Sequence, residues 1–144
     1  MMKAYRVVVA VLVLALMCAV PVHAEGLDDP IITPFASSFF ASYGISLGNP
    51  SGSTIHITMR VSAVETMAQL GGLTYDVQRR VNGTWITVAD DLTGSIGTNT
   101  ASYTFAKNYT AVSGYAYRVK VKFYAKKYDG TSSSSTVTSS SISV

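Results

Sequence analysis

Cysteine and histidine are scarce in this chain of 144 residues. It contains one cysteine, Cys18, and two histidines, His23 and His56. A redox pair, or a zinc site with several cysteine or histidine ligands, needs more of these residues than the chain offers. We therefore expect no bound metal and no cofactor.

Charged side chains are also absent from the segment between Arg6 and Glu25. A short basic start, an apolar run over residues 7–20 and small residues after it are typical of a secretory signal peptide. We predict a signal peptide over residues 1–24, with cleavage after Ala24, and a protein that is secreted into the extracellular space. The apolar run falls short of the roughly 20 residues that span a bilayer, which disfavours a retained membrane anchor.

Cleavage at this point would change the composition of the working protein. Lys3 and Arg6 would leave, so that nine basic side chains remain against eight acidic ones. Nucleic-acid binding needs a clustered basic excess, so we expect no nucleic-acid partner. Cys18 would leave too, which removes any cysteine nucleophile or disulfide and fits a bacterial exported protein. The alternative, a lipoprotein modified at Cys18, is disfavoured because Ala15 is smaller than the aliphatic residue usual three positions earlier.

A convincing helical pattern is missing from the mature sequence, and alternation of apolar and polar residues replaces it. Residues 25–36 contain two prolines and are expected to form an extended arm, followed by one all-β domain over residues 37–144. Ile55, Ile57, Met59 and Val61 illustrate the alternation in one expected strand. A helical turn is expected within residues 64–72, and an irregular stretch after Ala89.

The clearest turn signal is Asn82-Gly83, which favours a two-residue type I′ turn between two strands. Counting outward from this turn predicts five pairs: Val81 with Thr84, Arg80 with Trp85, Arg79 with Ile86, Gln78 with Thr87, and Val77 with Val88. The core face would then carry Tyr75, Val77, Ile86 and Val88. Arg80 and Trp85 would share the opposite, outward face.

The longest alternation runs from Tyr115 to Tyr124 and predicts another half-buried strand. Asp129-Gly130 is expected to turn the chain into a serine-rich last strand, with a bulge where the parity changes between Val137 and Ile142. A disordered or glycosylated stalk is the alternative for this tail. About seven strands of this spacing predict a single antiparallel β-sandwich of the immunoglobulin-like or fibronectin type III-like kind.

Two segments resemble strands of fibronectin type III and related immunoglobulin-like domains. Residues 115–121, Tyr-Ala-Tyr-Arg-Val-Lys-Val, resemble the sixth strand, and Tyr115 would be its corner tyrosine. Residues 73–77 and the hairpin that holds Trp85 resemble the third and fourth strands. The tryptophan typical of the second strand is missing from Ile55 to Val61, so the chain departs from the usual pattern.

The mature chain also resembles a family of short secreted proteins from clostridia and related Gram-positive bacteria. The resemblance rests on Gln78-Arg79, on Gly83-Thr84-Trp85, and on the strand that follows Gly114, and it extends from about Tyr43 onward. No activity is assigned to that family. The resemblance therefore implies export and a β domain, and it implies no catalytic residues.

Catalytic motifs are absent, so we expect a protein that is not an enzyme. His56 has the parity of an outward strand residue, and neither a Gly-x-Ser-x-Gly elbow nor a phosphate loop occurs. The pairs Asp28-Asp29 and Asp90-Asp91 lack the alternating oxygen ligands of a calcium loop and are interpreted as solvated turns. A small secreted hydrolase with two carboxylates across a bond is the least favoured alternative.

One group of residues is a candidate binding face. If the strand from Tyr115 pairs with the strand from Leu73, as the resemblance implies, one outward face carries Arg80, Trp85, Arg118, Lys120, Lys122 and Tyr124. Cations over an indole ring form a platform that can hold a sugar or a partner protein. We expect a non-catalytic protein that binds or adheres at the cell surface or in the medium. A structural, self-associating role is the alternative.

Overall fold

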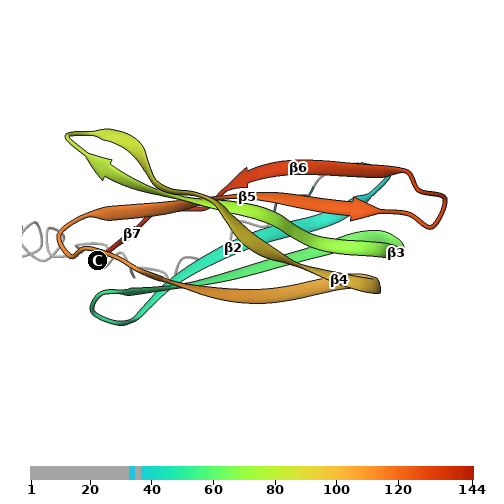
Figure 1. Cartoon of the computed structure of the whole chain (residues 1–144), viewed down its shortest axis with the longest axis horizontal. Helices are drawn as coiled ribbons and strands as arrows, with labels where there is room; N and C mark the ends of the chain where they lie inside the picture. The colour runs from blue at the N-terminus through green and yellow to red at the C-terminus, as the bar shows by residue number, and fades with distance from the viewer. Residues whose placement is uncertain (1–32, 35–36) are drawn as a thin grey trace, which may run out of the picture.

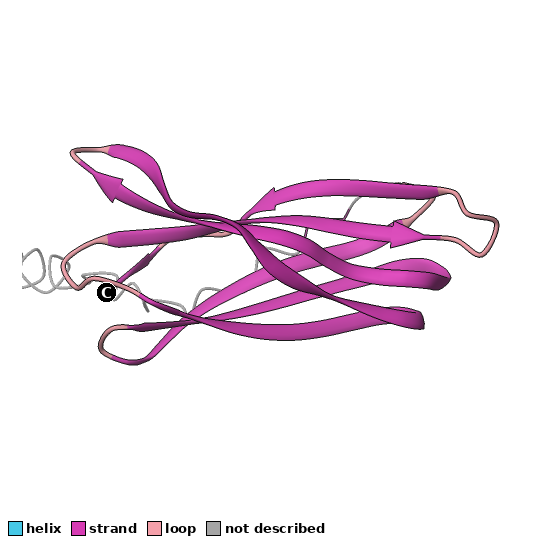
Figure 2. Ribbon diagram, in the orientation of Figure 1, coloured by secondary structure: helices cyan, strands magenta, loops and turns pink. Residues whose placement is uncertain are grey.

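The computed structural model describes residues 33–34 and 37–144, and all of its regular elements are strands (Figure 2). The strands are β1 (Thr33–Pro34), β2 (Phe40–Ser51), β3 (Thr54–Val81), β4 (Thr84–Thr110), β5 (Ala116–Lys126), β6 (Ser132–Thr138) and β7 (Ile142–Ser143). The predicted all-β class is confirmed. The described residues contain no helix that could cross a membrane.

The predicted signal peptide, residues 1–24 with the cleavage site after Ala24, lies outside the described residues, as does most of the arm predicted over residues 25–36. Two residues of that arm are described. Thr33–Pro34 form β1 and pair in an antiparallel manner with Ser42 and Tyr43 of β2.

The strands β3 and β4 form one long hairpin around Asn82-Gly83, whose φ angles of 48° and 81° fit the predicted type I′ turn. Four of the five predicted pairs are confirmed: Val81 with Thr84, Arg80 with Trp85, Arg79 with Ile86, and Gln78 with Thr87. The fifth is wrong. Val77 faces Ala89 because the register shifts between Val77 and Gln78, which leaves Val88 as an extra residue in a β-bulge.

The hairpin belongs to two halves of one curled sheet (Figure 1). In the first half, residues 54–62 of β3 lie between β2 and residues 102–110 of β4. In the second half, residues 69–79 of β3 lie between β5 and the first part of β4, and β5 pairs on its other side with β6 and β7. Because both halves belong to a single hydrogen-bonded sheet, a sandwich of two separate sheets stays a prediction.

Glycines allow β3 and β4 to stay paired where they pass from one half to the other. A Cβ atom on Gly71 would lie 2.1 Å from the carbonyl oxygen of Ser95, and one on Gly94 would lie 2.1 Å from that of Gly72. The strands therefore continue where we predicted a helical turn in residues 64–72 and an irregular stretch after Ala89. Both of these predictions are wrong, because glycine lets backbone pairing continue where propensity alone indicates a break.

The two halves of the sheet pack against each other through an apolar core. Tyr43 of β2 stacks on Phe123 of β5, with ring centroids 5.5 Å apart and an interplanar angle of 11°. Ser135 of β6 donates a hydrogen bond to the Tyr43 hydroxyl at 3.3 Å. The side chains that are fully shielded include Ile55, Ile57, Met59, Val61, Met67, Leu70, Val77, Val119, Val121 and Phe123. Burial of this apolar surface is the main stabilising contribution, since the described residues contain no cysteine.

The predicted core face of the hairpin is correct near the body of the sheet and wrong at the tip. Tyr75 and Val77 are buried and Val88 packs partly against the core, but Ile86 is 40% exposed. Ile86 pairs with Arg79 near the turn, where the tip of the hairpin diverges from the start of β5 (Figure 1). In the described part of the chain, the pairing of β5 with β3 ends at Arg79 and does not reach the tip.

Tyr117, and not Tyr115 as predicted, makes the backbone hydrogen bonds expected of a corner tyrosine. The Tyr117 hydroxyl accepts a hydrogen bond from the Val112 amide at 2.9 Å and donates one to the Val112 carbonyl at 3.0 Å. This is the contact that defines the corner in immunoglobulin-like domains. Tyr115 has the same parity but precedes β5, is 36% exposed, and lies under the guanidinium of Arg79 at 4.5 Å.

The serine-rich tail is a strand, which excludes the stalk for residues 132–138. β6 pairs with β5 along its whole length, with Ser132 opposite Lys126 at one end and Thr138 opposite Lys120 at the other. β7 then pairs with the start of β5. The predicted change of parity corresponds to a break at residues 139–141. Ser139 bridges this break, because its amide donates to the Val119 carbonyl and its hydroxyl accepts from the Val119 amide.

The turn between β5 and β6 holds a carboxylate with a lowered pKa. Asp129 Oδ1 accepts hydrogen bonds from the hydroxyl and the amide of Thr131, at 2.6 and 2.8 Å, and these bonds lower the pKa of Asp129 below its usual range. The ionised form therefore stabilises the folded state above the unfolded pKa of 3.8, and this contribution is lost as the pH falls through the lower folded pKa. We expect Asp129→Asn to be less stable than wild type at pH 7 and the difference to shrink towards pH 2. Urea midpoints across this range measure it, and a difference independent of pH would contradict the assignment.

Candidate functional site

The register of the second half of the sheet brings basic residues of β3 and β5, together with Trp85 of β4, onto one outward surface. Arg80 of β3 pairs with Trp85 of β4, and β5 adds every second residue from Arg118 onward. The predicted pairing of the strand after Tyr115 with the strand after Leu73 is confirmed, since Gln78 faces Arg118 and Asp76 faces Lys120. We call this surface the basic face and define it by Arg80, Trp85, Arg118, Lys120 and Lys122.

At one end of the basic face, Arg118 is fixed by two neighbours. Its guanidinium carbon lies 4.4 Å from the centroid of the Trp85 ring, and its Nε donates a hydrogen bond of 2.8 Å to Gln78 Oε1. Gln78 is fixed in turn, because its Nε2 donates to Thr87 Oγ1 at 3.3 Å. The guanidinium is therefore held in place before any ligand arrives, which reduces the entropy lost on binding.

The terminal nitrogens of Arg118 are available to a ligand. Within the described residues they make no hydrogen bond or ion pair, and Nε alone is engaged. Arg80 adds a second cation at 6.0 Å from the Trp85 ring, with its Nε donating to the Gly83 carbonyl at 3.4 Å. A planar guanidinium with two free amino groups matches a carboxylate or phosphate, so this end of the face suits an anion.

The Trp85 ring contacts the guanidinium groups of Arg80 and Arg118. The indole is partly buried, and Arg118 covers one of its faces. The sequence led us to expect an open indole platform under several cations, whereas the structure places the ring mainly as a support for Arg118. Cation–π contacts of this kind contribute about 0.5–1 kcal/mol at exposed sites.

Further along β5, Lys120 and Lys122 extend the positive charge. The strand carries four basic residues, all of the same parity, and no acidic residue. Tyr124 has that parity as well, but it lies opposite Gly71 and Ser134, about 20 Å along the strand from Arg118 at roughly 3.4 Å per residue. Tyr124 therefore has the predicted parity, but the structure places it far from Trp85.

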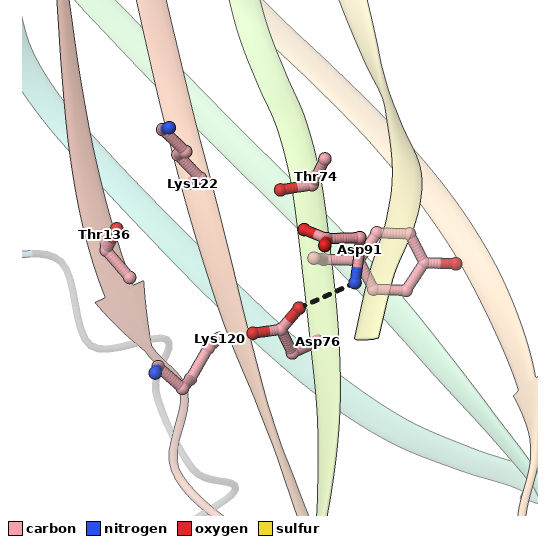
Figure 3. A pocket seen from close by; sticks show the side chains of 7 residues that line it. Thr74, Asp76, Asp91, Lys120, Lys122 and Thr136 are labelled. Atoms are coloured by element: carbon pink, nitrogen blue, oxygen red, sulfur yellow. Dashed lines mark hydrogen bonds between the residues drawn. The ribbon is translucent and has the colours of Figure 1, made fainter. Parts of the chain in front are cut away.

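A polar groove of about 200 Å³ adjoins Lys120 and Lys122 (Figure 3). Its lining comes from four strands and consists of Thr74, Tyr75, Asp76, Asp91, Lys120, Lys122 and Thr136. A second bulge of β4 lies here, between the pairs Tyr75–Leu92 and Val77–Ala89. Asp76 Oδ1 accepts a hydrogen bond of 2.9 Å from the Asp91 amide, and Asp91 has a φ of 47°, so this bulge is tied to β3. Sequence reasoning missed this groove, although Asp76 and Thr74 share the parity of Arg80.

No family model, no curated protein and no solved structure matches this chain. A proposal for the function of this protein therefore rests on the geometry of the basic face and its groove.

The other candidate residues form no metal-binding group within the described residues. His56 is exposed, and its Nδ1 lies 2.8 Å from Asn108 Oδ1 across the strand pair. No group of three histidine, cysteine or acidic side chains suited to a metal ion occurs in residues 33–34 and 37–144. Asp28-Asp29 lies outside these residues, and Asp91 engages Asp76 as described above.

Burial raises the pKa of the Tyr75 phenol above its usual value near 10. Tyr75 borders the groove, but it has the parity of the core residues and its side chain is buried at 7% exposure. Its hydroxyl is therefore protonated at neutral pH.

Proposed function

We propose that this protein is an exported, non-catalytic binding protein that attaches to anionic partners at the cell surface or in the medium. The basic face is its binding surface. The observation that carries the proposal is the immobilised guanidinium of Arg118, stacked on Trp85 and tied to Gln78. Fixing a side chain in its binding geometry serves recognition, because a free surface arginine loses more entropy on binding.

The distribution of charge supports an anionic partner. All nine basic residues that follow the predicted signal peptide lie in the described strands and turns, whereas Glu25, Asp28 and Asp29 precede the domain. The domain is therefore more basic than the near-neutral mature chain. An acidic glycan or an acidic surface protein has the chemistry to bind here.

Arg118→Ala tests the proposal directly. We expect the purified chain to bind immobilised polygalacturonate at low salt, and the substitution to weaken that binding about 10-fold to 100-fold, since a charge-assisted hydrogen bond contributes about 1.5–3 kcal/mol. Biolayer interferometry measures the affinity. The matched control is Arg60→Ala, which removes an exposed arginine from the outward side of β3 in the other half of the sheet. Neutral dextran should not bind.

Trp85→Ala shows how the indole acts. If Trp85 supports Arg118, the loss should be about 2-fold to 5-fold, which corresponds to a cation–π contact of about 0.5–1 kcal/mol. A loss larger than that of Arg118→Ala would mean that the ring itself holds the ligand. Equal affinities of wild type, Arg118→Ala and Arg60→Ala would contradict the basic face as a binding surface.

A structural, self-associating role is the second candidate, and the outer edge of β4 is the observation that bears on it. β4 pairs with β3 alone among the described strands, and open edges can template pairing with a second chain. Asp91 and Asn99 interrupt this edge with φ angles of 47° and 51°, which favours the binding role. Light scattering at high concentration separates the two roles, because a strict monomer would contradict assembly.

The resemblances fit the same proposal. Export through a signal peptide over residues 1–24 would bring the basic face to the outside of the cell, as in the short secreted clostridial proteins that the chain resembles. An immunoglobulin-like or fibronectin type III-like domain is a common scaffold for such binding.

A further inference from the structure

The groove beside the basic face has acidic and basic walls that do not neutralise each other. Asp76 and Asp91 lie on the side of β3 and β4, while Lys120 and Lys122 project from β5 towards Thr136 (Figure 3). Asp76 and Lys120 are direct cross-strand neighbours, yet the ion pair found in the described residues is Lys127 with Glu65. Both walls therefore keep charged atoms available to a ligand.

The position of the acidic wall depends on the bulge in β4. Tyr75 pairs with Leu92 and Val77 with Ala89, so that Asp90 and Asp91 together oppose Asp76. The left-handed backbone of Asp91 turns its amide onto Asp76 Oδ1. One oxygen of Asp76 is thus used inside the protein, and the other is left to accept a hydrogen bond from outside.

We propose that this groove is a subsite for a single acidic sugar unit, with its carboxylate at Lys120 and Lys122 and its ring hydroxyls at Asp76 and Asp91. This inference rests on the proposed function, because the subsite would hold one unit of the anionic chain that Arg118 binds. Carboxylates accept strong hydrogen bonds from hydroxyl groups, and ammonium groups bind carboxylates. An acidic sugar unit presents an anion and several hydroxyl donors together.

The size and lining of the groove agree with one sugar ring. Its volume of about 200 Å³ lies below the roughly 300–1,000 Å³ of pockets for drug-sized ligands. Thr74 and Thr136 add hydroxyl groups to the lining. Arg118 lies one outward position before Lys120 on β5, about 7 Å away at roughly 3.4 Å per residue, so the next unit of the chain reaches it.

The test compares two polymers that carry the same anion. Polygalacturonate has a carboxylate and hydroxyl groups in each unit, whereas polyglutamate has a carboxylate and no hydroxyl. Asp76→Asn keeps an oxygen for the Asp91 amide and replaces the other by an amino group. We expect this variant to weaken binding of polygalacturonate about 10-fold and to strengthen binding of polyglutamate slightly, because a repelling charge is removed. Asp90→Asn is the matched control, since it removes a neighbouring exposed charge outside the groove.

The outcomes separate the subsite from the proposed function. Opposite changes for the two polymers, found with Asp76→Asn and not with Asp90→Asn, support the sugar subsite. If Asp76→Asn strengthens binding of both polymers while Arg118→Ala still weakens it, the subsite is wrong and the basic face stands. Polyglutamate binding as tight as that of polygalacturonate to wild type would assign the groove to an acidic protein instead. Binding of neither polymer would overturn both proposals.

Discussion

Gly71→Ala is expected to destabilise the domain by about 3 kcal/mol or more. The new Cβ would lie 2.1 Å from the Ser95 carbonyl oxygen and 2.9 Å from the Ile96 Cα, and both are backbone atoms. No change of rotamer can relieve this contact, so β3 and β4 must separate where they pass between the two halves of the sheet. Overpacking usually costs about 1–3 kcal/mol, and a clash with the backbone lies at or above the top of that range.

A loss of this size is large for a domain whose total stability is about 5–15 kcal/mol. Thermal unfolding should show a midpoint lower by about 10–15 °C, from the usual unfolding entropy per residue. The matched control is Gly48→Ala in β2, where an added Cβ meets no atom within 4 Å and the change should stay within about 0.5 kcal/mol. Equal midpoints for the two variants would show that the strands can part at Gly71 without cost.

The hairpin shows how far local sequence signals predict this fold. Asn82-Gly83 fixes a turn type, and the turn fixes the next four pairs, because each pair follows from its neighbour by counting. Counting fails at the first bulge, beside Val77, since an extra residue depends on packing against other strands. The prediction of a break at Gly71-Gly72 fails for a similar reason. In the sequence, a glycine that lets two strands approach closely looks the same as a glycine that ends a strand or a helix.

The residues of the candidate site were likewise predictable only in part. Arg80 and Trp85 were placed by the turn, and Arg118 by the pairing that the resemblance implies, so the structure brings these three residues together. Gln78 has the parity of Arg80 and could have been included by counting. Asp91 could not, because the bulge of β4 that carries it towards Asp76 has no signal in the sequence.

The bulge at Asp90 and Asp91 also shapes the groove of the candidate site. A regular β4 would point its side chains in strict alternation, and Asp90 and Asp91 would then lie on opposite faces. The extra residue instead lets Asp91 bond to β3 through its amide while its side chain lines the groove. Bulges often occur where a strand must re-aim a side chain beside a binding site.

Tyr117→Phe is the second substitution for which we expect a large effect. It removes one oxygen atom and leaves the ring in place, in a side chain that is 1% exposed. The Val112 amide and carbonyl would both lose their partner, so the connection between β4 and β5 would no longer be tied to the start of β5. Leaving such groups unsatisfied costs about 1–3 kcal/mol, and equilibrium unfolding in urea measures it.

Tyr115→Phe is the matched control, because it makes the same chemical change two residues earlier. Tyr115 precedes β5, and its ring, which the substitution keeps, lies under the Arg79 guanidinium. We expect a change within about 0.5 kcal/mol. A larger loss of stability for Tyr115→Phe than for Tyr117→Phe would show that Tyr115 is the corner tyrosine, as the sequence pattern indicated. The expected order instead ties the corner to the first buried tyrosine of β5, since the hydroxyl must reach Val112 from inside the sheet.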